Sequence, residues 1–205
     1  ATEVAEFILA AHTALGLKPL FAAVQFGEAT AYPHGVPHPQ VLADGDMVLI
    51  DMGGTLHGYC SDITRTYVFG TPTPRQRQLW ELERQAQAAA FAAARIGTPC
   101  AAVDAAARKV FADAGFGPGY EVPGLPHRTG HGLGLDIHEA PYIVGGNSTP
   151  LAAGMCFSIE PMLCVYGECG VRLEDIVYMT DSGPRWFVPP ATRLDDPFGR
   201  TEIGA

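Results

Sequence analysis

The sequence predicts an α+β fold, in which helices and antiparallel strands occupy separate stretches of the chain. Three segments, 2–16, 73–97 and 98–115, carry helix signals, and each of them ends at a glycine. Runs rich in β-branched and aromatic residues lie between the first two of these segments and again from 143 to 188. This order of helix, strands, two helices and strands differs from the strand–helix alternation that indicates a parallel sheet.

Composition limits the kind of protein. The chain has 205 residues, which suits one domain with a substantial core, and its 47 % of hydrophobic residues excludes disorder for the whole. The formal net charge is −9 and no cluster of lysines and arginines exceeds two residues, so we expect neither nucleic acid nor an anionic membrane as partner. No long apolar run and no basic-then-apolar leader is visible, which favours a cytoplasmic location. Five cysteines without a metal-binding spacing are predicted to be reduced and mostly buried: Cys60, Cys100, Cys156, Cys164 and Cys169.

Capping residues and glycines set the expected helix boundaries. The first helix is expected over 2–15, where apolar side chains form a stripe. The longest is expected over 74–96, with Thr73 as N-cap and Gln76 at the position that a capping box requires. A second Thr-Pro pair is expected to open the third helix, over 98–114, in the same manner.

The first and third helices resemble each other, since each is alanine-rich, ends at a glycine and precedes a segment that bears a histidine. His34 lies 18 residues after Gly16, and His131 lies 16 residues after Gly115. This favours two similar halves around one site, although two helices of ordinary composition can also look this alike. Further strands are expected at 21–26, 154–159, 162–166, 171–179 and 185–188.

Two aspartates mark a predicted hairpin at the centre of the chain. Asp51 ends the apolar run 47–50, and Asp62 lies within the β-branched segment 59–69. A turn near residues 56–57 would place the two aspartates opposite each other, with Cβ atoms roughly 4.5–5.5 Å apart. Two ionised carboxylates at that distance repel, so one is protonated or a cation lies between them. The alternative from the hairpin alone is a pair of surface aspartates beside a turn.

A second group of chemistry-bearing residues lies in the C-terminal half. His131 and His138 fall in the glycine-rich segment 128–141, which is better suited to a strand and loop near a ligand than to a helix. No second histidine follows at the spacing that a zincin requires. Glu160 ends an apolar strand and Glu174 lies inside one, and a charged group in such a position is costly unless it is paired or bound to metal.

Strand alternation places Arg172 on the same face as Glu174, where it could also be no more than a salt-bridge partner. With Asp51, Asp62, Glu160 and one histidine, Glu174 completes a set that is rich in oxygen and has a single nitrogen. Such a set suits Mn²⁺, Co²⁺, Fe²⁺ or Zn²⁺ in a two-metal centre better than a structural zinc site, which prefers thiolates. Two such ions can hold a bridging hydroxide and polarise a carbonyl, which is hydrolytic chemistry.

Five motifs in this order resemble those of the pita-bread metallopeptidases, and most closely the Xaa-Pro dipeptidases (prolidases) and aminopeptidase P. The motifs are PHGVP, LIDMGGTLHGYCSDITRT, RTGHGLGLDIHEAP, FSIEP and GVRLEDIV, and the resemblance spans residues 2 to 188. It implies a fold of two pseudo-symmetric halves, with antiparallel sheet flanked by helices. It also implies a dinuclear-metal peptidase that cleaves the Xaa-Pro bond at the N-terminus of dipeptides or short peptides through a metal-bridging hydroxide. Two divalent ions, Mn²⁺ first and Co²⁺, Zn²⁺ or Fe²⁺ as alternatives, would be the cofactor.

The same resemblance implies roles for individual residues. The metal ligands would be Asp51, Asp62, His131, Glu160 and Glu174, with Asp62 and Glu174 bridging both ions. His34, His127 and His138 would contact the substrate carbonyl or the proline end and move protons, and Glu160 would double as the base. Arg172 would hold the proline side of the substrate or orient Glu174.

The chain departs from the family pattern at one motif and in its extent. The family usually has Glu-Pro-Gly followed two residues later by tyrosine, whereas this chain has Glu160-Pro161-Met162-Leu163-Cys164, which affects the expected substrate wall near Cys164. The N-terminal domain of the family is absent, so we expect residues 1–205 to be the catalytic domain and the full-length form to be a homodimer. The alternatives are a methionine aminopeptidase, a creatinase-like C–N hydrolase and a non-catalytic binding domain of the same fold.

Overall fold

The computed structural model describes residues 1–198 and confirms the α+β class. The N-terminal half contains α1 (Thr2–Ala14), β1 (Lys18–Phe26), the 3₁₀ helix η1 (Gly27–Ala31), β2 (Met47–Leu56), β3 (Tyr59–Val68) and α2 (Pro74–Ala93). The C-terminal half contains α3 (Cys100–Asp113), β4 (Gly130–Gly132), β5 (Glu139–Ile143), β6 (Cys156–Ile159), β7 (Met162–Val165), β8 (Cys169–Arg172), β9 (Asp175–Thr180) and β10 (Gly183–Trp186).

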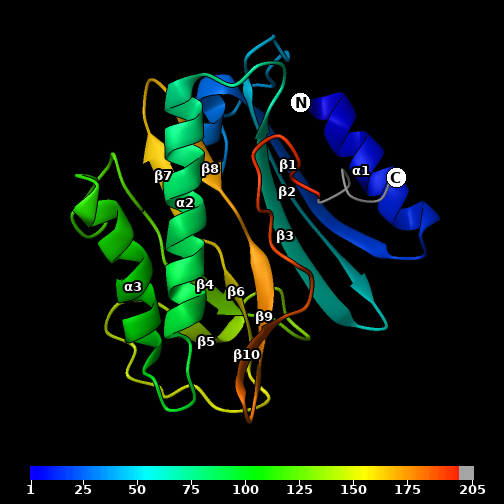
Figure 1. Cartoon of the computed structure of the whole chain (residues 1–205). Coiled ribbons are helices and arrows are strands. Elements are labelled where there is room, and N and C mark those ends of the chain that lie inside the picture. The colour runs from blue at the N-terminus through cyan, green and yellow to red at the C-terminus, as the bar shows by residue number, and fades with distance from the viewer. Residues whose placement is uncertain (199–205) are drawn as a thin grey trace, which may run out of the picture.

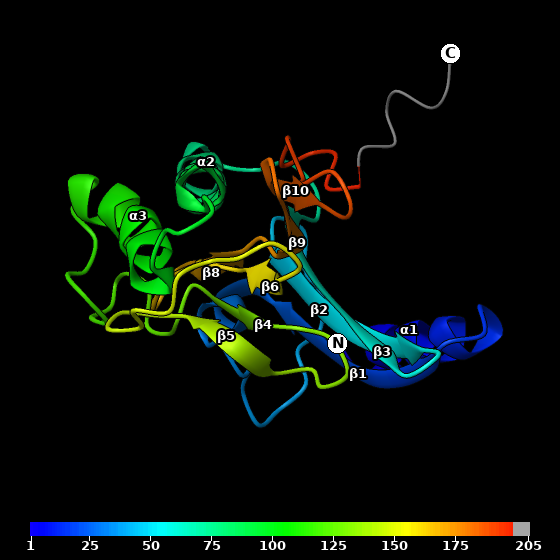
Figure 2. The same cartoon turned by 90° about the horizontal axis from the view of Figure 1, so that it is seen from below.

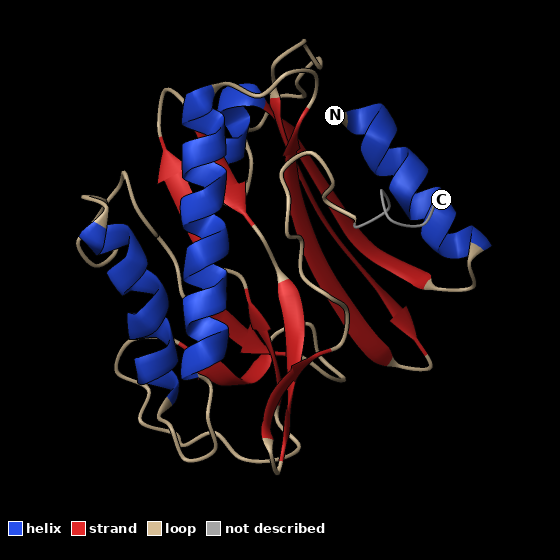
Figure 3. Cartoon of the chain, in the orientation of Figure 1, coloured by secondary structure: helices blue, strands red, loops and turns tan. Residues whose placement is uncertain are grey.

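The strands form three antiparallel sheets. Their strand orders are β1-β2-β3, β10-β9-β6-β4-β5 and β7-β8. Figures 1 and 2 place α2 and α3 side by side over one face of the strands from the C-terminal half, whereas α1 packs against the three-stranded sheet. In Figure 3 the helices accordingly lie on the outside and the strands between them. Each half thus begins with a helix and continues into antiparallel strands, as the two-halves interpretation expects.

The β2–β3 hairpin has a different register from the one predicted. Asp51 pairs with Thr64, and Asp62 pairs with Gly53, so the two aspartates are diagonal neighbours instead of direct partners. The reason is the turn: His57 and Gly58 both have positive φ, 52° and 89°, which is typical of a two-residue type I′ turn and moves the centre of the hairpin by one residue. Because the side-chain period of a strand is two, the aspartates still lie on one face.

The capping prediction is confirmed for α2 and wrong for α3. At the start of α2 the Thr73 hydroxyl accepts from the Gln76 backbone N–H, and the Gln76 side chain accepts from the Thr73 N–H. The third helix instead begins at Cys100 with Pro99 as its N-cap and no side-chain cap. A proline at this position has no side-chain oxygen to offer the free N–H groups, so this helix start lacks the cap that the sequence suggested.

The strand predicted over 171–179 is two strands. β8 ends at Arg172 and β9 begins at Asp175, and between them Glu174 forms an isolated bridge with Thr64 of β3. The Glu174 N–H donates to the Thr64 carbonyl across 3.1 Å. Glu174 therefore lies where the chain passes from the two-stranded sheet to the five-stranded sheet, and there its backbone bridges to β3 of the three-stranded sheet.

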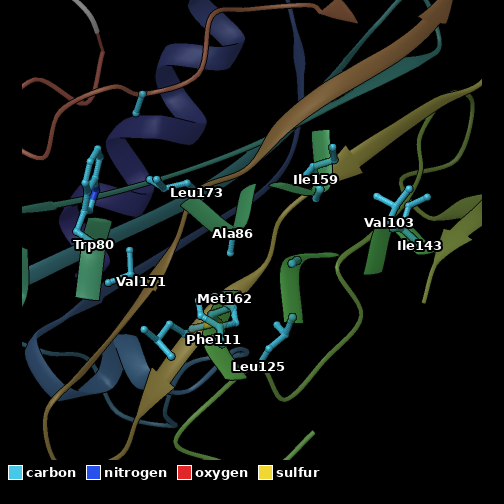
Figure 4. Packing of buried hydrophobic residues seen from close by; sticks show 14 of the residues in the cluster. Trp80, Ala86, Val103, Phe111, Leu125, Ile143, Ile159, Met162, Val171 and Leu173 are labelled. Carbon is cyan, nitrogen blue, oxygen red and sulfur yellow. The ribbon is translucent and has the colours of Figure 1, made fainter. Parts of the chain in front are cut away.

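The main hydrophobic core lies between α2, α3 and the strands that they cover (Figure 4). Trp80, Ala86, Phe111, Met162 and Leu173 belong to this buried cluster. At its edge the Trp80 indole N–H donates to the Thr66 carbonyl, which ties α2 to β3. The core thus fixes the helices to the strands that carry the candidate ligands. Within the described residues no helix has the length and apolar character needed to span a bilayer.

Candidate metal centre

Five predicted ligands converge from five places in the fold. Asp51 comes from β2, Asp62 from β3, His131 from β4, Glu160 from the end of β6 and Glu174 from the break between β8 and β9. Ligand atoms lie within 4.8 Å of one another in three groups: Asp51–Asp62–Glu174, His131–Glu160–Glu174 and Asp62–His131–His138. Asp62, His131 and Glu174 each belong to two groups. Of these three, the carboxylates of Asp62 and Glu174 have two oxygens and could each serve two neighbouring cations.

Three of the carboxylates each leave one oxygen without a protein partner. These buried atoms are Asp51 Oδ1, Asp62 Oδ1 and Glu174 Oε1. The second oxygen of Glu174 accepts from the Thr64 hydroxyl at 2.6 Å, and that of Asp51 accepts from Arg172 at 2.5 Å. A buried polar atom is normally satisfied, so this cluster of free acceptors fits divalent cations.

The pKa shifts of the clustered carboxylates also favour bound cations. Burial, together with the nearby Asp51 and Glu160 carboxylates, raises the pKa of Asp62 to about 9. Burial and the neighbouring acids raise the pKa of Glu174 well above its usual value, and burial raises that of Asp51. Burial also opposes ionisation of Glu160, but the His131 hydrogen bond and nearby positive charge lower its pKa to about 2. The protein alone does not balance four ionised carboxylates here, whereas divalent cations would.

His131 has the orientation that a metal-binding histidine needs. Its Nδ1 lies 3.0 Å from the Gly132 carbonyl oxygen, so a proton on that nitrogen leaves Nε2 with its lone pair free. Nε2 faces Glu160 Oε1 at 3.0 Å and Asp62 Oδ2 at 3.7 Å. With a proton on Nε2, His131 donates the hydrogen bond that lowers the pKa of Glu160. With the proton on Nδ1 instead, this nitrogen and both carboxylates are acceptors, and a shared cation would satisfy all three.

The other three predicted histidines line a cavity of about 710 Å³ that also contains the five ligands. His138 is exposed, and its ring centroid lies 4.3 Å from that of His131. The Nε2 of His127 is buried and has no protein partner, whereas its Nδ1 lies 2.6 Å from the Arg128 carbonyl oxygen. Burial lowers the pKa of His127, and partial burial together with His131 and Arg128 lowers the pKa of His138. His34 reaches the same cavity from the loop after η1.

Comparison with known proteins decides the family. The family model of metallopeptidase family M24 matches residues 1–181. The chain belongs to this family. The Xaa-Pro dipeptidase of Lactobacillus delbrueckii subsp. lactis is 41 % identical over 171 residues, which are 83 % of this chain and 45 % of the relative. The probable dipeptidase PepE of Mycobacterium tuberculosis is 45 % identical over 185 residues, 89 % of this chain and 47 % of the relative.

Solved M24 structures confirm the pita-bread fold that the motifs implied. Dipeptidase PepE from Mycobacterium ulcerans matches with a TM-score of 0.84 and 47 % identity, over 90 % of this chain and 49 % of that protein. The prolidase from Pyrococcus furiosus matches with a TM-score of 0.84 and 37 % identity, over 90 % and 54 %. The chain therefore spans about half the length of the relatives it matches.

Arg172 of this M24 chain contacts a different carboxylate from the one that strand alternation suggested. Its guanidinium pairs with Asp51 at 2.5 Å and donates to the Thr64 hydroxyl at 3.2 Å, and no ion pair joins it to Glu174 among the described residues. A third contact, 3.4 Å long, reaches the Pro33 carbonyl. Most of its donors thus have partners in the protein. Of the roles expected for it, orientation of a ligand fits these contacts best, and the ligand concerned is Asp51.

Two hydroxyls of the M24 site were missed by sequence reasoning. Thr64 donates to Glu174, and Ser158 donates to Glu160 Oε1 at 3.0 Å while it accepts from the His131 backbone N–H. Strand alternation could have indicated both hydroxyls, because Thr64 lies two residues from Asp62 and Ser158 two residues from Glu160, on the same face of the strand. Cys164, in contrast, is fully buried in β7 against Gly124 and does not line the cavity.

Proposed function

We propose that this chain is the catalytic part of a dinuclear-metal peptidase that hydrolyses the Xaa-Pro bond at the N-terminus of dipeptides or short peptides. The observation that carries the proposal is the cluster of three buried, unpartnered carboxylate oxygens beside His131 and Glu160. The names of two relatives, Xaa-Pro dipeptidase and prolidase, support the substrate class. The catalytic domain would extend over residues 1–205, of which 199–205 lie outside the described part. We also propose that the full-length form is a homodimer.

In this proposal Asp51, Asp62 and Glu174 hold one ion, and His131, Glu160 and Glu174 hold the other. Asp62 Oδ2 lies 3.7 Å from His131 Nε2, so Asp62 would contribute to the binding of both ions. Four carboxylates and one imidazole suit Mn²⁺ first, with Co²⁺, Zn²⁺ or Fe²⁺ as alternatives. When bound, the ions would polarise the scissile carbonyl and supply a nucleophilic hydroxide at neutral pH.

The side chains of this chain would perform the remaining steps. Glu160, whose Oε1 accepts from the Ser158 hydroxyl, would be the base that takes a proton from the attacking water. His138, exposed at the edge of the cluster, can pass a proton to the leaving group or steady the carbonyl oxygen. His127 lines the same cavity, and its buried Nε2, which has no protein partner, would contact the proline end. His34 would complete the wall around the substrate, and Arg172, which lines the same cavity, would orient Asp51.

Selectivity for proline is the test that separates this function from that of a methionine aminopeptidase. An Xaa-Pro bond has no amide N–H, so the site need not offer an acceptor there. We expect hydrolysis of Xaa-Pro over Xaa-Ala with a ratio of kcat/KM of at least ~10, which is about 1.4 kcal/mol in transition-state binding. Gly-Pro, an Xaa-Pro-Yaa tripeptide, Gly-Ala and Met-Ala-Ser, each assayed with Mn²⁺, provide the measurement and its controls.

Two results would contradict the proposed function in different ways. Release of methionine from Met-Ala-Ser as fast as release of glycine from Gly-Pro would overturn the Xaa-Pro assignment. The proposed metal centre would not be affected by that result. Binding of these peptides without hydrolysis of any of them would indicate a non-catalytic binding domain.

A further inference from the structure

The helix α2 carries a buried amide, Gln87, behind the two glutamates of the candidate centre. Gln87 is 2 % exposed and lies on the helix face that also buries Ala86 and Ala90 in the core. Figure 4 shows Ala86 of this helix in the core together with Leu173 and Ile159, the residues that precede Glu174 and Glu160. An alanine at those helix positions offers no hydrogen bond. Gln87 does, and its donors face the strands.

The amide nitrogen of Gln87 reaches backbone next to both glutamates. Nε2 lies 3.1 Å from the Leu173 carbonyl oxygen and 3.4 Å from the Ile159 carbonyl oxygen. It lies 3.0 Å from Asp175 Oδ2 as well. One side chain therefore contacts the residue before Glu160, the residue before Glu174 and the residue after Glu174.

These contacts fix the peptide planes from which the glutamates project. The N–H of Glu160 donates to the Thr129 carbonyl at 2.8 Å, and the N–H of Glu174 donates to the Thr64 carbonyl at 3.1 Å. Because a peptide unit is planar, holding its carbonyl on one side and its N–H on the other sets the position of the next Cα. Gln87 supplies the carbonyl side for both planes.

A buried ion pair extends the same support. Asp175 accepts from Gln87 with one oxygen and from Arg65 with the other, the latter at 2.6 Å. Arg65 also donates to the carbonyls of Glu174, at 2.9 Å, and Thr64, at 3.0 Å. The strand break that presents Glu174 is thus held by hydrogen bonds from α2 on one side and from β3 on the other.

We infer that Gln87 is a positioning residue for the metal centre: it sets the relative placement of Glu160 and Glu174 so that both meet His131 at one cation. The inference rests on the proposed function. A displacement of a few tenths of an ångström at two ligands matters more than at one, since both belong to the His131–Glu160–Glu174 group. Residues that orient metal ligands in this way typically change metal affinity by 10–100-fold when they are replaced.

The test compares Gln87→Met, which keeps the volume and removes the donors, with Gln85→Met on the exposed side of the same helix. Mn²⁺ is titrated calorimetrically into the metal-free chain, and the visible absorption of the Co²⁺-loaded chain is recorded. We expect Gln87→Met to weaken the affinity for at least one ion by ~10–100-fold and to alter the Co²⁺ spectrum. Gln85→Met is expected to match the wild type in both measurements.

A purely structural role would lower the thermal midpoint of Gln87→Met and leave the affinity and the Co²⁺ spectrum unchanged, and this result overturns the inference. If Gln87→Met does not fold, Gln87→Glu decides the question, since it keeps length and shape and exchanges the donor for an acceptor facing Asp175 and two carbonyls. If Gln87→Glu has the same metal affinity and the same Co²⁺ spectrum as the wild type, the inference is equally overturned. A wild-type chain that binds neither Mn²⁺ nor Co²⁺ would overturn the proposed function itself and the inference with it.

Discussion

Replacement of Asp62 by asparagine is expected to remove peptidase activity and bound metal together. Asp62 belongs to two of the three ligand groups, and its Oδ1 is buried with no protein partner. An asparagine amide is neutral and presents only one oxygen, so it cannot bridge two cations as a carboxylate can. Because metal activation is worth several kcal/mol, we expect kcat on Gly-Pro to fall by ~10³-fold or more.

The variant Asp136→Asn provides the matched control, because Asp136 is exposed on the loop between His131 and His138 and belongs to no ligand group. It is expected to retain both activity and metal. Elemental analysis of the purified variants gives the metal content alongside the assay. Full metal content in Asp62→Asn would show that this carboxylate does not bridge the ions.

The second large effect is expected at His138. Its replacement by alanine should lower kcat by ~10²–10⁴-fold while metal stays bound, because a proton-transfer group is lost and the five ligands remain. Partial burial, followed by the nearby His131 and Arg128, lowers the pKa of His138, so its ring can take up a proton and then pass it to the leaving group. Metal content and kcat, measured on the same preparation, check both parts of this expectation.

His138 also lies within ligand distance of Asp62 and His131, so the structure leaves a second assignment to be tested. Loss of one ion in His138→Ala, with both ions kept in His131→Ala, would mean that the two histidines exchange roles. His38→Ala serves as the control for a histidine change, because His38 is exposed and does not line the cavity.

The four candidate carboxylates could be chosen from the sequence because a charged group in an apolar strand is costly without a partner, whereas only the resemblance to the family distinguished His131 from the other histidines. The hairpin register could not be obtained in the same way. Asp51 and Asp62 were expected to face each other, but the turn residues His57 and Gly58 shift the pairing so that Thr64 faces Asp51. Gly58 at the second turn position is a local signal for this turn type, whereas the spacing of the two aspartates alone does not show where the turn lies.

The contacts around Glu174 depend on residues far apart in the chain. Strand alternation across 171–179 assumed a continuous strand, and the bridge between Glu174 and Thr64, 110 residues away, breaks it. Arg172 consequently meets Asp51 instead of Glu174. Gln87 had no signal at all, since a glutamine in an alanine-rich helix usually faces solvent. Only the packing of α2 on the strands reveals what it contacts.

The number of metal ions per chain tests the central claim most directly. The chain, freed of metal by chelation and titrated with Mn²⁺, is expected to bind two ions, and hydrolysis of Gly-Pro is expected to return as they bind. Elemental analysis after removal of free metal provides the count. Saturation at a single ion would contradict the dinuclear centre, and full activity of the chelated chain with no ion bound would contradict the metallopeptidase account altogether.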